Sequence, residues 1–313
     1  MLELKNISFY YIKDNVIFKD IEMSLRQGQI YALMGLSGAG KSTLLNIISG
    51  LQKIKAGKVI LNDRDITDEK PFLRNVGYVF QDYGLFPNLS VKENIAFGLR
   101  SKFSKQQILA KVKSIVELTQ LQEQIDKSVN EISGGQKQRV ALARTLVTSP
   151  SILLLDEVFS AIDNDIKSGI RKSLKDVLVK TNCTTLLVSH SFDDVCHLCQ
   201  EVFFIVGKKI VGPYKPMDLL SNPINYSIAK LIGLNNVIEN RNNFFGMTEK
   251  YCYVPEKAFV NIDSSSTMEI MPTNDFVIKN GTKWYEYELF GVLIYAIADY
   301  RFIDTKNIIA LDE

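Results

Sequence analysis

The stretch Gly35-Leu36-Ser37-Gly38-Ala39-Gly40-Lys41-Ser42-Thr43 decides the fold of this chain. It has the pattern G-x-x-x-x-G-K-S, follows a short apolar run at residues 29–34, and continues into apolar residues at helical spacing. Such a turn between a strand and a helix points backbone N–H groups at a phosphate, and the helix N-terminus favours the negative charge. The pattern predicts a P-loop that binds a nucleotide, with Lys41 on its β- and γ-phosphates and Ser42 on Mg²⁺. The alternative is a glycine-rich turn without a ligand.

A second apolar run, residues 151–155, ends in two acidic residues, Asp156 and Glu157. A continuous apolar run is typical of a central parallel strand that is buried on both faces. Ligands of parallel sheets lie beyond the carboxyl ends of the strands, so we expect both carboxylates to face the phosphates. Asp156 is the predicted Mg²⁺ ligand, directly or through water, and Glu157 is placed to polarise the attacking water. An exposed acidic turn is the alternative interpretation.

A second glycine-rich helix start follows at residues 132–139, with the sequence I-S-G-G-Q-K-Q-R. Ser133 suits an N-cap, and the two glycines allow the backbone to approach an anion closely. One P-loop already supplies a phosphate site, so this motif needs a second explanation. Here the chain resembles the ATP-binding subunits of ABC transporters, whose signature is L-S-G-G-Q. The resemblance implies that Ser133, Gly134, Gly135 and Gln136 close over the γ-phosphate held by a partner's P-loop, in a head-to-tail homodimer with two ATP molecules at the interface.

Further positions match the family one by one. The resemblance implies that Gln81 ligates Mg²⁺ and senses the membrane partner, and that Tyr11 stacks on adenine, with Tyr10 as the competing choice. Asp163 resembles the D-loop aspartate at the subunit contact, and His190 the switch histidine that contacts the γ-phosphate. The expected catalytic residues are therefore Glu157, His190 and Gln81, and the expected Mg²⁺ ligands are Ser42, Gln81 and Asp156.

Three positions depart from the family's pattern. Ile132 replaces the leucine of the signature, Val158 follows the acidic pair in place of proline, and Ser191 follows the switch histidine in place of aspartate. None of these changes removes a group that performs chemistry. Ile132 is a mild aliphatic change, and we expect Val158 and Ser191 to affect loop geometry and turnover rate and to leave nucleotide binding intact.

A helical segment is expected around residues 104–121, where apolar residues recur at helical spacing. In the family this subdomain docks the coupling helices of the membrane subunits. Residues 85–91, L-F-P-N-L-S-V, resemble the L-F-P-H-x-T-V stretch that is common in importer ATPases. The alternative is that Leu85, Phe86 and Leu89 belong to the core of the subdomain.

Composition divides the chain in two. The 313 residues suggest about two domains. We split the chain at an expected turn, Gly212-Pro213: residues 1–213 carry a net charge of +6 and the remainder carries −4, together with 15 of the 31 aromatic residues. The net charge of +2 over the whole chain argues against a bulk nucleic-acid binder. No apolar run approaches the ~18 residues of a membrane span, and the start does not read as a secretory signal.

The cysteines do not indicate a scaffold. Four cysteines in a chain of this length are expected to be free thiols in a reducing cytosol. Cys196 and Cys199 have C-x-x-C spacing, but a structural zinc site needs a second pair. We expect both to lie on the core-facing stripe of a helix.

The tail reads as a separate module. Residues 217–223 resemble the helix and Asn-Pro stretch that leads out of importer ATPase domains, and short aromatic strands follow between residues 251 and 298. They resemble the OB-like regulatory domain of importer ATPases for sugars, polyamines, sulfate, molybdate or ferric iron. We predict an ATPase domain at 1–233 with a helical subdomain at about 85–145, and a small β-rich accessory or regulatory domain at 234–313. A dimer-stabilising module without a ligand is the alternative.

The resemblance implies an α/β fold, a P-loop NTPase of the ABC type with a helical subdomain and a small C-terminal mostly-β domain. It implies the ATP-hydrolysing subunit of an importer that works with integral membrane permease subunits and, indirectly, an extracytoplasmic solute-binding protein. Such a subunit is peripheral, on the cytoplasmic face of the inner membrane, and binds no nucleic acid. The alternatives are an ABC exporter ATPase and a soluble ABC ATPase outside transport. Selectivity for the solute lies in other subunits.

Overall fold

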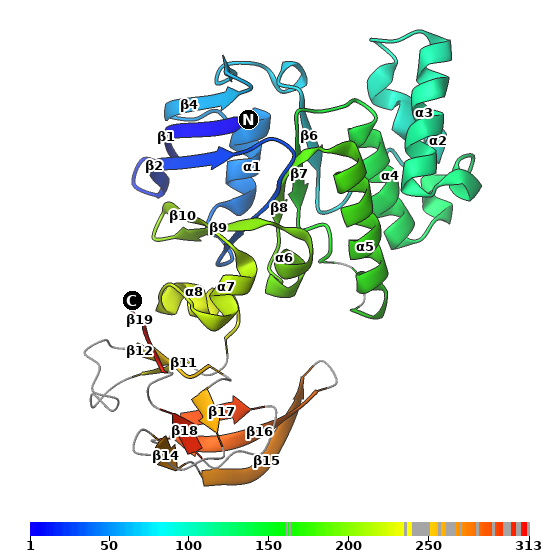
Figure 1. Cartoon of the computed structure of the whole chain (residues 1–313). Coiled ribbons are helices and arrows are strands. Elements are labelled where there is room, and N and C mark those ends of the chain that lie inside the picture. Colours follow the sequence, from blue (N-terminus) through cyan, green and yellow to red (C-terminus); the bar gives the residue numbers. More distant parts are fainter. Residues whose placement is uncertain are drawn as a thin grey trace. The chain divides into compact units, whose positions relative to one another are not determined.

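The computed structural model describes residues 1–160, 162, 164–234, 237–239, 251–255, 258–260, 267–269, 271–279, 282–289, 292–296, 302–304 and 308–311. The chain divides into two compact units, Met1–Pro216 and Met217–Glu313 (Figure 1). Among the described residues, no helix combines the length and the apolar character that a bilayer crossing requires.

An antiparallel sheet begins the first unit, with the strand order β2-β1-β4-β5. Its strands are β1 (Leu2–Tyr10), β2 (Val16–Leu25), β4 (Ala56–Leu61) and β5 (Arg64–Asp65). Along the end of β2, buried Ile21, Met23 and Leu25 alternate with exposed Glu22 and Ser24. This period of two places one face of the sheet on the core and the other in solvent.

A second sheet of six strands has the order β10-β9-β3-β8-β7-β6, and its neighbouring strands are parallel except for β9 and β10. The strands are β3 (Ile30–Gly35), β6 (Val76–Val79), β7 (Ile152–Asp156), β8 (Thr184–Val188), β9 (Glu201–Val206) and β10 (Lys209–Tyr214). Every residue of β3, β7 and β8 is buried, as expected of central parallel strands. The buried strands predicted before the P-loop and before Asp156 are confirmed.

The helices of the first unit fall into two groups. Three helices each follow one of the parallel strands along the chain: α1 (Lys41–Ser49), α5 (Asn164–Thr181) and α6 (Phe192–Leu198). Helices α2 (Val91–Ala96), α3 (Lys105–Thr119) and α4 (Gly134–Leu146) gather on one side of the unit (Figure 1). Short 3₁₀ turns are η1 (Pro71–Leu73), η2 (Phe97–Leu99), η3 (Gln122–Gln124) and η4 (Val129–Glu131). The helix expected around residues 104–121 is confirmed as α3.

The core of the first unit lies where both sheets pack together with α1. Its members come from strands of both sheets and from the helix after the P-loop, and all are at most 2% exposed: Leu4, Phe18, Tyr31, Leu44, Leu154 and Leu186. The P-loop is therefore anchored at both ends, by a buried strand and by a helix whose apolar face is part of the same core.

The turn expected at Gly212-Pro213 is wrong, because β10 continues through these residues to Tyr214. The pairing of β10 with β9 shifts register between Val211 and Tyr214, and Gly212 has a φ of 118° there. Strand β10 is at the edge of the sheet, where a proline without an N–H group and a local bulge are tolerated. The compact first unit ends three residues later, at Pro216.

The second unit is rich in short strands. Its helices are α7, which begins at the boundary (Pro216–Ser221), and α8 (Tyr226–Leu231). Among the described residues of this unit, three sheets of three strands have the orders β11-β12-β19, β13-β18-β14 and β15-β16-β17. The strands are β11 (Val237–Glu239), β12 (Tyr251–Tyr253), β13 (Phe259–Val260), β14 (Thr267–Glu269), β15 (Met271–Lys279), β16 (Thr282–Leu289), β17 (Val292–Ala296), β18 (Phe302–Asp304) and β19 (Ile309–Leu311). Tyr226 of α8 stacks on Tyr251 of β12 at 3.6 Å.

Candidate nucleotide site

The predicted P-loop connects β3 to α1, the arrangement that its pattern indicates. Gly38 and Gly40 have φ values of 77° and 100°, in the region that glycine adopts without strain. A Cβ atom on Gly40 would lie 2.7 Å from Cγ2 of Ile17 and 2.8 Å from Cζ of Phe18. The conformation and the packing therefore both require glycine at this position.

Lys41 is a buried cation inside the loop. Its side chain is 5% exposed, and Nζ donates to the carbonyl oxygens of Gly35 and Leu36, both at 3.0 Å. Burial lowers the pKa of Lys41, and the nearby carboxylates of Glu157 and Asp156 act in the opposite direction. A cation held only by carbonyl oxygens is ready to exchange them for the stronger acceptor oxygens of a phosphate.

An oxygen cluster lies beside the loop. Ser42 Oγ donates to Oδ1 of Asp156 at 3.3 Å, and the hydroxyl of Tyr78 donates to Oδ2 at 3.0 Å. Burial raises the pKa of Asp156, while the two hydroxyl donors act in the opposite direction. A hydroxyl and a carboxylate at this distance form the hard oxygen set that Mg²⁺ prefers, so these residues fit that ion. Tyr78 was not singled out from the sequence, because nothing there separates it from an ordinary core tyrosine.

Glu157 and His190 meet at the ends of β7 and β8. Nε2 of His190 lies 2.6 Å from Oε1 of Glu157, and the side chains are 50% and 18% exposed. The backbone of Glu157 has a φ of 50°, an uncommon conformation for a residue with a Cβ. It is held by hydrogen bonds from Glu157 N to Val188 O at 3.1 Å and from Ser160 Oγ to Glu157 O at 2.8 Å. The structure thus brings these two predicted residues into direct contact.

Gln81, which follows β6, contacts the loop after β7. Its Nε2 donates to Oγ of Ser160 at 3.3 Å, and Ser160 Oγ in turn donates to the carbonyl of Glu157. Gln81 is therefore joined to the loop after β7, and the described contacts do not join it to Asp156. The predicted D-loop aspartate, Asp163, lies outside the described residues.

The two candidate adenine platforms have different surroundings. Tyr11 is 59% exposed, its hydroxyl is 3.1 Å from Oγ1 of Thr43 in the P-loop, and its ring meets Phe9 edge to face at 4.8 Å. Tyr10 instead has Nζ of Lys55 over its ring at 5.2 Å. Of the two, Tyr11 has the direct contact with the P-loop.

The glycine-rich motif at the start of α4 is partly exposed: Ser133 and Gly134 are exposed, whereas Ile132 is buried. Ser133 is the N-cap: its Oγ accepts from Gln136 N at 3.3 Å, and its own N donates to Oε1 of Gln136 at 2.9 Å. This capping box confirms the predicted N-cap. A Cβ atom on Gly134 would meet no atom within 4 Å. In the described part of the chain, no hydrogen bond joins this motif to the P-loop of the same chain.

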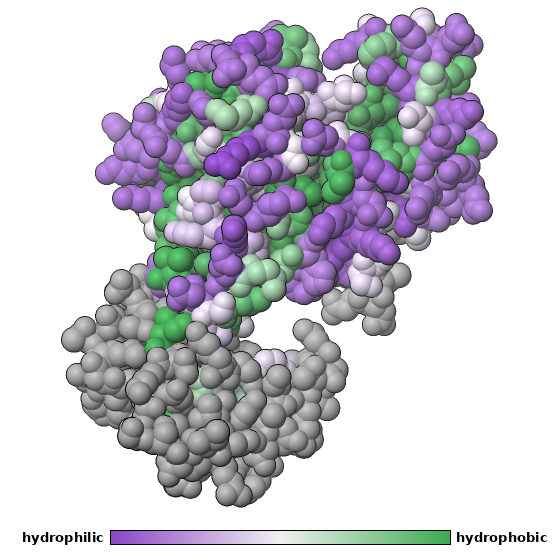
Figure 2. All heavy atoms as spheres, viewed as in Figure 1, coloured by the Kyte–Doolittle hydropathy of each residue, from purple (hydrophilic) through white to green (hydrophobic). Residues whose placement is uncertain are grey.

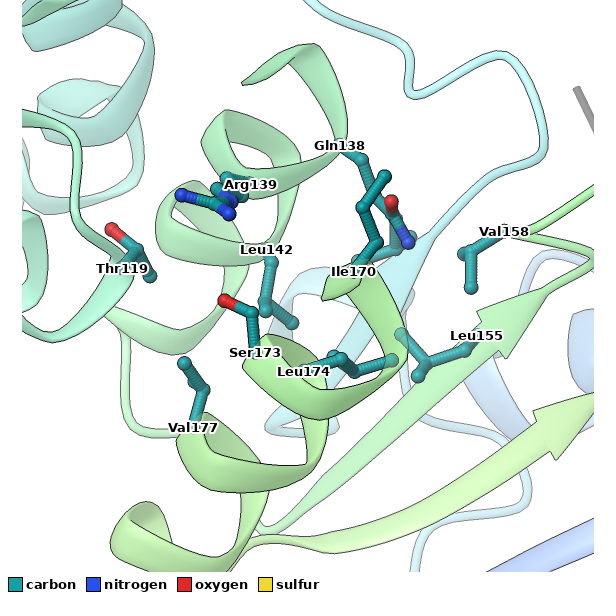
Figure 3. Close-up of a pocket in the computed structure, with 11 residues that line it drawn as sticks. Thr119, Gln138, Arg139, Leu142, Leu155, Val158, Ile170, Ser173, Leu174 and Val177 are labelled. Atoms are coloured by element: carbon teal, nitrogen blue, oxygen red, sulfur yellow. The ribbon is translucent and has the colours of Figure 1, made fainter. Parts of the chain in front are cut away.

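A mostly apolar pocket lies between α4 and α5 (Figure 3). Gln138 points into it beside Ile170 and Val158, and the buried Oε1 atom of Gln138 has no hydrogen-bond partner. The cavity has a volume of about 20 Å³. This volume suits a single water molecule and is too small for a nucleotide or a transported solute.

The two C-x-x-C cysteines are free thiols, Cys196 within α6 and Cys199 at its C-cap. The expectation that both lie on a helix is therefore wrong for Cys199, whose extended backbone ends α6. Cys199 is buried, which raises the pKa of its thiol, and Cys196 is partly buried. In the described residues, no three His, Cys, Asp or Glu side chains form a cluster that could hold a metal ion.

Comparison with known proteins agrees with this geometry. Residues 18–160 match the family described as ABC transporter. The structure is similar to CbiO1 from Clostridium perfringens, part of the ABC transporter complex CbiONQ: the identity is 30%, the match covers 70% of this chain and 89% of that chain, and the TM-score is 0.64. It is also similar to two dimeric structures of the bacterial ABC transporter cassette MJ0796, one of them in a post-hydrolysis state with ADP and Pi. In both cases the identity is 27%, the match covers 69% of this chain and 99% of the MJ0796 chain, and the TM-score is 0.61.

The strand–P-loop–helix unit, the acidic end of β7 and the second glycine-rich helix start define an ATP-binding cassette. The chain belongs to the ABC transporter ATP-binding family. It is an ATPase of that family, and the nucleotide that it binds and hydrolyses is ATP.

Proposed function

We propose that this chain is the ATP-hydrolysing subunit of an importer. Two copies bind MgATP, close head to tail, and drive solute transport through integral membrane permease subunits. Closure moves the permease toward its outward-facing state, and hydrolysis with phosphate release resets it. The proposal includes the domain division given above: an ATPase domain at 1–233, with a helical subdomain at about 85–145, and a regulatory or dimer-stabilising β-rich domain at 234–313.

The roles of the site residues belong to the same proposal. Lys41 and the N–H groups of the P-loop hold the β- and γ-phosphates, since phosphoryl transfer depends mainly on positioning and charge stabilisation. Ser42 and Asp156 would hold Mg²⁺, with Gln81 as the third proposed ligand, and the ion would neutralise phosphate charge. Glu157 orients the attacking water and accepts its proton. The remaining roles are adenine stacking for Tyr11, γ-phosphate contact for His190 and subunit contact for Asp163.

The exposed motif before α4 supports the homodimer. Ser133 and Gly134 are exposed, and Gly134 has open space beside it. A helix N-terminus of this kind attracts phosphate. The similarity to the dimeric MJ0796 structures supports the same arrangement.

The observation that carries the transport proposal is an exposed aromatic pair linked to α4. The rings of Phe86 and Phe97 are 4.4 Å apart and are 37% and 47% exposed. Arg144 of α4 donates from Nη1 to Gly84 O at 2.7 Å and from Nη2 to Tyr83 O at 2.9 Å. In the proposed dimer, a force on the aromatic pair would be transmitted through Arg144 to α4, whose N-terminus would face the ATP held by the partner's P-loop.

The surface around this segment suits a protein partner. Hydrophobic residues gather between hydrophilic ones over the helices α2, α3 and α4 (Figure 2). Exposed apolar groups rimmed by polar residues are typical of interaction sites. Of the alternatives for residues 85–91, exposed Phe86 supports docking, whereas Leu85 and Leu89 are partly buried.

Import is favoured over export by residues 85–91 and by the appended β-rich tail, both of which resemble importer ATPases. The proposed location is the cytoplasmic face of the membrane, where permease subunits would hold the chain. The similarity to CbiO1, itself part of a multi-subunit transporter complex, supports such partners.

Reconstitution tests this function directly. The full chain is co-purified with its permease subunits and placed in vesicles with the ATPase on the outside. The expected result is ATP-dependent release of lumenal solute, stimulated by an extracytoplasmic solute-binding protein trapped inside. ATP-driven movement in the opposite direction would replace the importer with an exporter, and absence of any membrane partner would favour a soluble ABC ATPase.

The aromatic pair is tested in the same system. Phe86→Ala combined with Phe97→Ala should preserve the ATPase activity of the isolated chain and abolish co-purification with the permease. Val179→Ala, which alters an apolar side chain of α5 that is 63% exposed, is the matched control. Normal co-purification of the double variant would remove the aromatic pair from the docking surface.

A further inference from the structure

Helices α5 and α6 are in contact (Figure 1). Helix α5 carries a stripe of basic side chains that contacts both ends of α6. Lys167, Arg171 and Lys175 are spaced by four residues, so they lie on one face of α5. Nζ of Lys167 and Nε of Arg171 lie 3.0 Å and 2.8 Å from the two carboxylate oxygens of Asp194, in the first turn of α6. Nζ of Lys175 donates to the carbonyl of His197, in its last turn, at 2.7 Å.

Asp194 is the buried centre of this contact. It is 1% exposed, and a buried carboxylate is costly unless opposite charges and hydrogen bonds compensate for it. Lys167 and Arg171, which are 12% and 13% exposed, supply those charges. The neighbouring Asp193 is different: it is 59% exposed and contacts Nη1 of Arg171 at 2.6 Å. The two acidic residues thus pair with the same helix in different environments.

Asp194 also reaches the turn that carries His190. Oγ of Ser189 donates to Oδ2 of Asp194 at 3.1 Å and accepts from the backbone N of Ser191 at 3.1 Å. Ser189 and Ser191 flank His190, so this hydroxyl fixes the backbone on both sides of the histidine. His190 in turn contacts Glu157 at 2.6 Å. A continuous set of contacts therefore runs from α5 through Asp194 to Glu157.

Lys167 also lies near the segment that follows β7. Its Nζ lies 5.9 Å from the ring centroid of Phe159, two residues after Glu157. One cavity of about 80 Å³ is lined by side chains from all three segments, among them Glu157, Phe159, Lys167, Ser189, His190 and Asp194. The charged contact and the proposed hydrolytic pair are parts of one site.

We propose that Asp194 is a positioning residue for ATP hydrolysis. It holds the His190 turn against α5, so that His190 and Glu157 face the reacting phosphate together. This inference rests on the proposed roles of Glu157 and His190.

Kinetics of the full chain test the inference. Asp194→Asn and Ser189→Ala should each lower kcat by about tenfold or more, while the Kd for MgATP changes by less than about twofold, because the contact acts on the hydrolytic step. Ser189→Thr keeps the hydroxyl and should restore kcat to within about threefold of the wild-type value. Asp193→Asn, which alters the exposed neighbour, should retain wild-type kcat. Thermal unfolding identifies any variant that fails to fold.

The two Ser189 variants, Ser189→Ala and Ser189→Thr, still test the inference if Asp194→Asn does not fold. Wild-type kcat in folded Ser189→Ala would overturn the inference, as would a loss that Ser189→Thr fails to restore. An equal loss of MgATP affinity would also overturn it. Glu157→Gln is assayed beside these variants. If it hydrolyses ATP at the wild-type rate, the proposed hydrolytic site is wrong; if it is inactive while the Asp194 and Ser189 variants are fully active, only the positioning role is wrong.

Discussion

Individual residues at the nucleotide site are held in unfavourable states. Glu157 has a positive φ of 50°, Lys41 is a buried cation with a lowered pKa, and Asp156 is a buried carboxylate with a raised pKa. Each state lowers the stability of the fold unless a ligand compensates for it. Phosphate oxygens would compensate for Lys41, and a cation would compensate for Asp156. Perturbed groups that gather in this way are typical of functional sites.

Glu157→Gln should leave MgATP binding intact and lower hydrolysis by about 100-fold or more, because an amide cannot accept the proton of the attacking water. The amide keeps the size of the side chain and an oxygen acceptor for His190. The same variant should accumulate a dimer with bound ATP, measured by light scattering after size exclusion. Glu117→Gln, which alters an exposed residue of α3, is the control. Wild-type turnover in Glu157→Gln would remove Glu157 from its role.

Lys41→Ala should weaken ATP binding by about tenfold or more, since charge-assisted hydrogen bonds to phosphate are lost. The fold should remain intact, because the lysine contacts only two backbone carbonyl groups in addition to the nearby carboxylates. Calorimetric titration with MgATP measures the affinity, and Lys53→Ala, at an exposed position after α1, is the control. Unchanged affinity would contradict the P-loop assignment.

At the scale of elements, the helices of the helical segment begin with the same capping motif. Helices α2, α3 and α4 each begin with a serine N-cap and a capping box: Ser90 with Glu93, Ser104 with Gln107, and Ser133 with Gln136. Each box satisfies backbone N–H groups that the helix itself leaves unpaired. Helix starts in this segment are therefore fixed by local sequence.

The cap of α2 gives a prediction about pH. Backbone and side-chain hydrogen bonds from Ser90 lower the pKa of Glu93 below its usual value of 4.5. A lowered pKa stabilises the fold above the unfolded pKa, and this contribution is lost as the pH falls through the folded pKa. The difference in free energy of unfolding between wild type and Glu93→Gln should thus be largest above pH 4.5 and shrink as the solution is acidified below that value. Urea titrations across this range measure it, with Asp126→Asn as the control; a difference that grows on acidification would contradict the assignment.

At the scale of the whole molecule, the described contacts of the nucleotide site lie within the first compact unit. Lys41, Asp156, Glu157 and His190 find their partners among residues of Met1–Pro216. The second unit has contacts of its own, such as the hydrogen bond from the Tyr253 hydroxyl to Leu220 O at 3.0 Å. A unit with its own contacts can in principle be separated from its neighbour.

A chain shortened to residues 1–216, the first compact unit, should fold and retain MgATP affinity, because the nucleotide site loses none of its described partners. Circular dichroism and calorimetric titration check these two outcomes. The oligomeric state of the Glu157→Gln form of the same shortened chain tests the dimer-stabilising role proposed for residues 234–313. Loss of ATP binding in a shortened chain that is still folded would show that the tail contributes to the nucleotide site.

The sequence alone predicted those features whose cause is local. A glycine-rich turn between an apolar run and a helix, a serine directly before two glycines, and an apolar run that ends at Asp156 each require only neighbouring residues, and the elements predicted from them are present. The expected turn at Gly212-Pro213 was wrong because pairing with β9 extends β10 past both residues. Local turn preference gave way there to the hydrogen bonds of a long-range strand pair.

Tertiary structure decided which side chains meet. Tyr78 on Asp156, Ser160 beside Gln81, and the contacts of Asp194 join residues from different strands and helices, so no short pattern indicates them. The sequence determined the class of chemistry, because a phosphate cradle and an acidic strand end are local arrangements of backbone and charge. The geometry that couples those groups depends on the crossing of α5, α6 and the parallel strands, because packing of the core fixes the distances between segments that lie far apart in the chain.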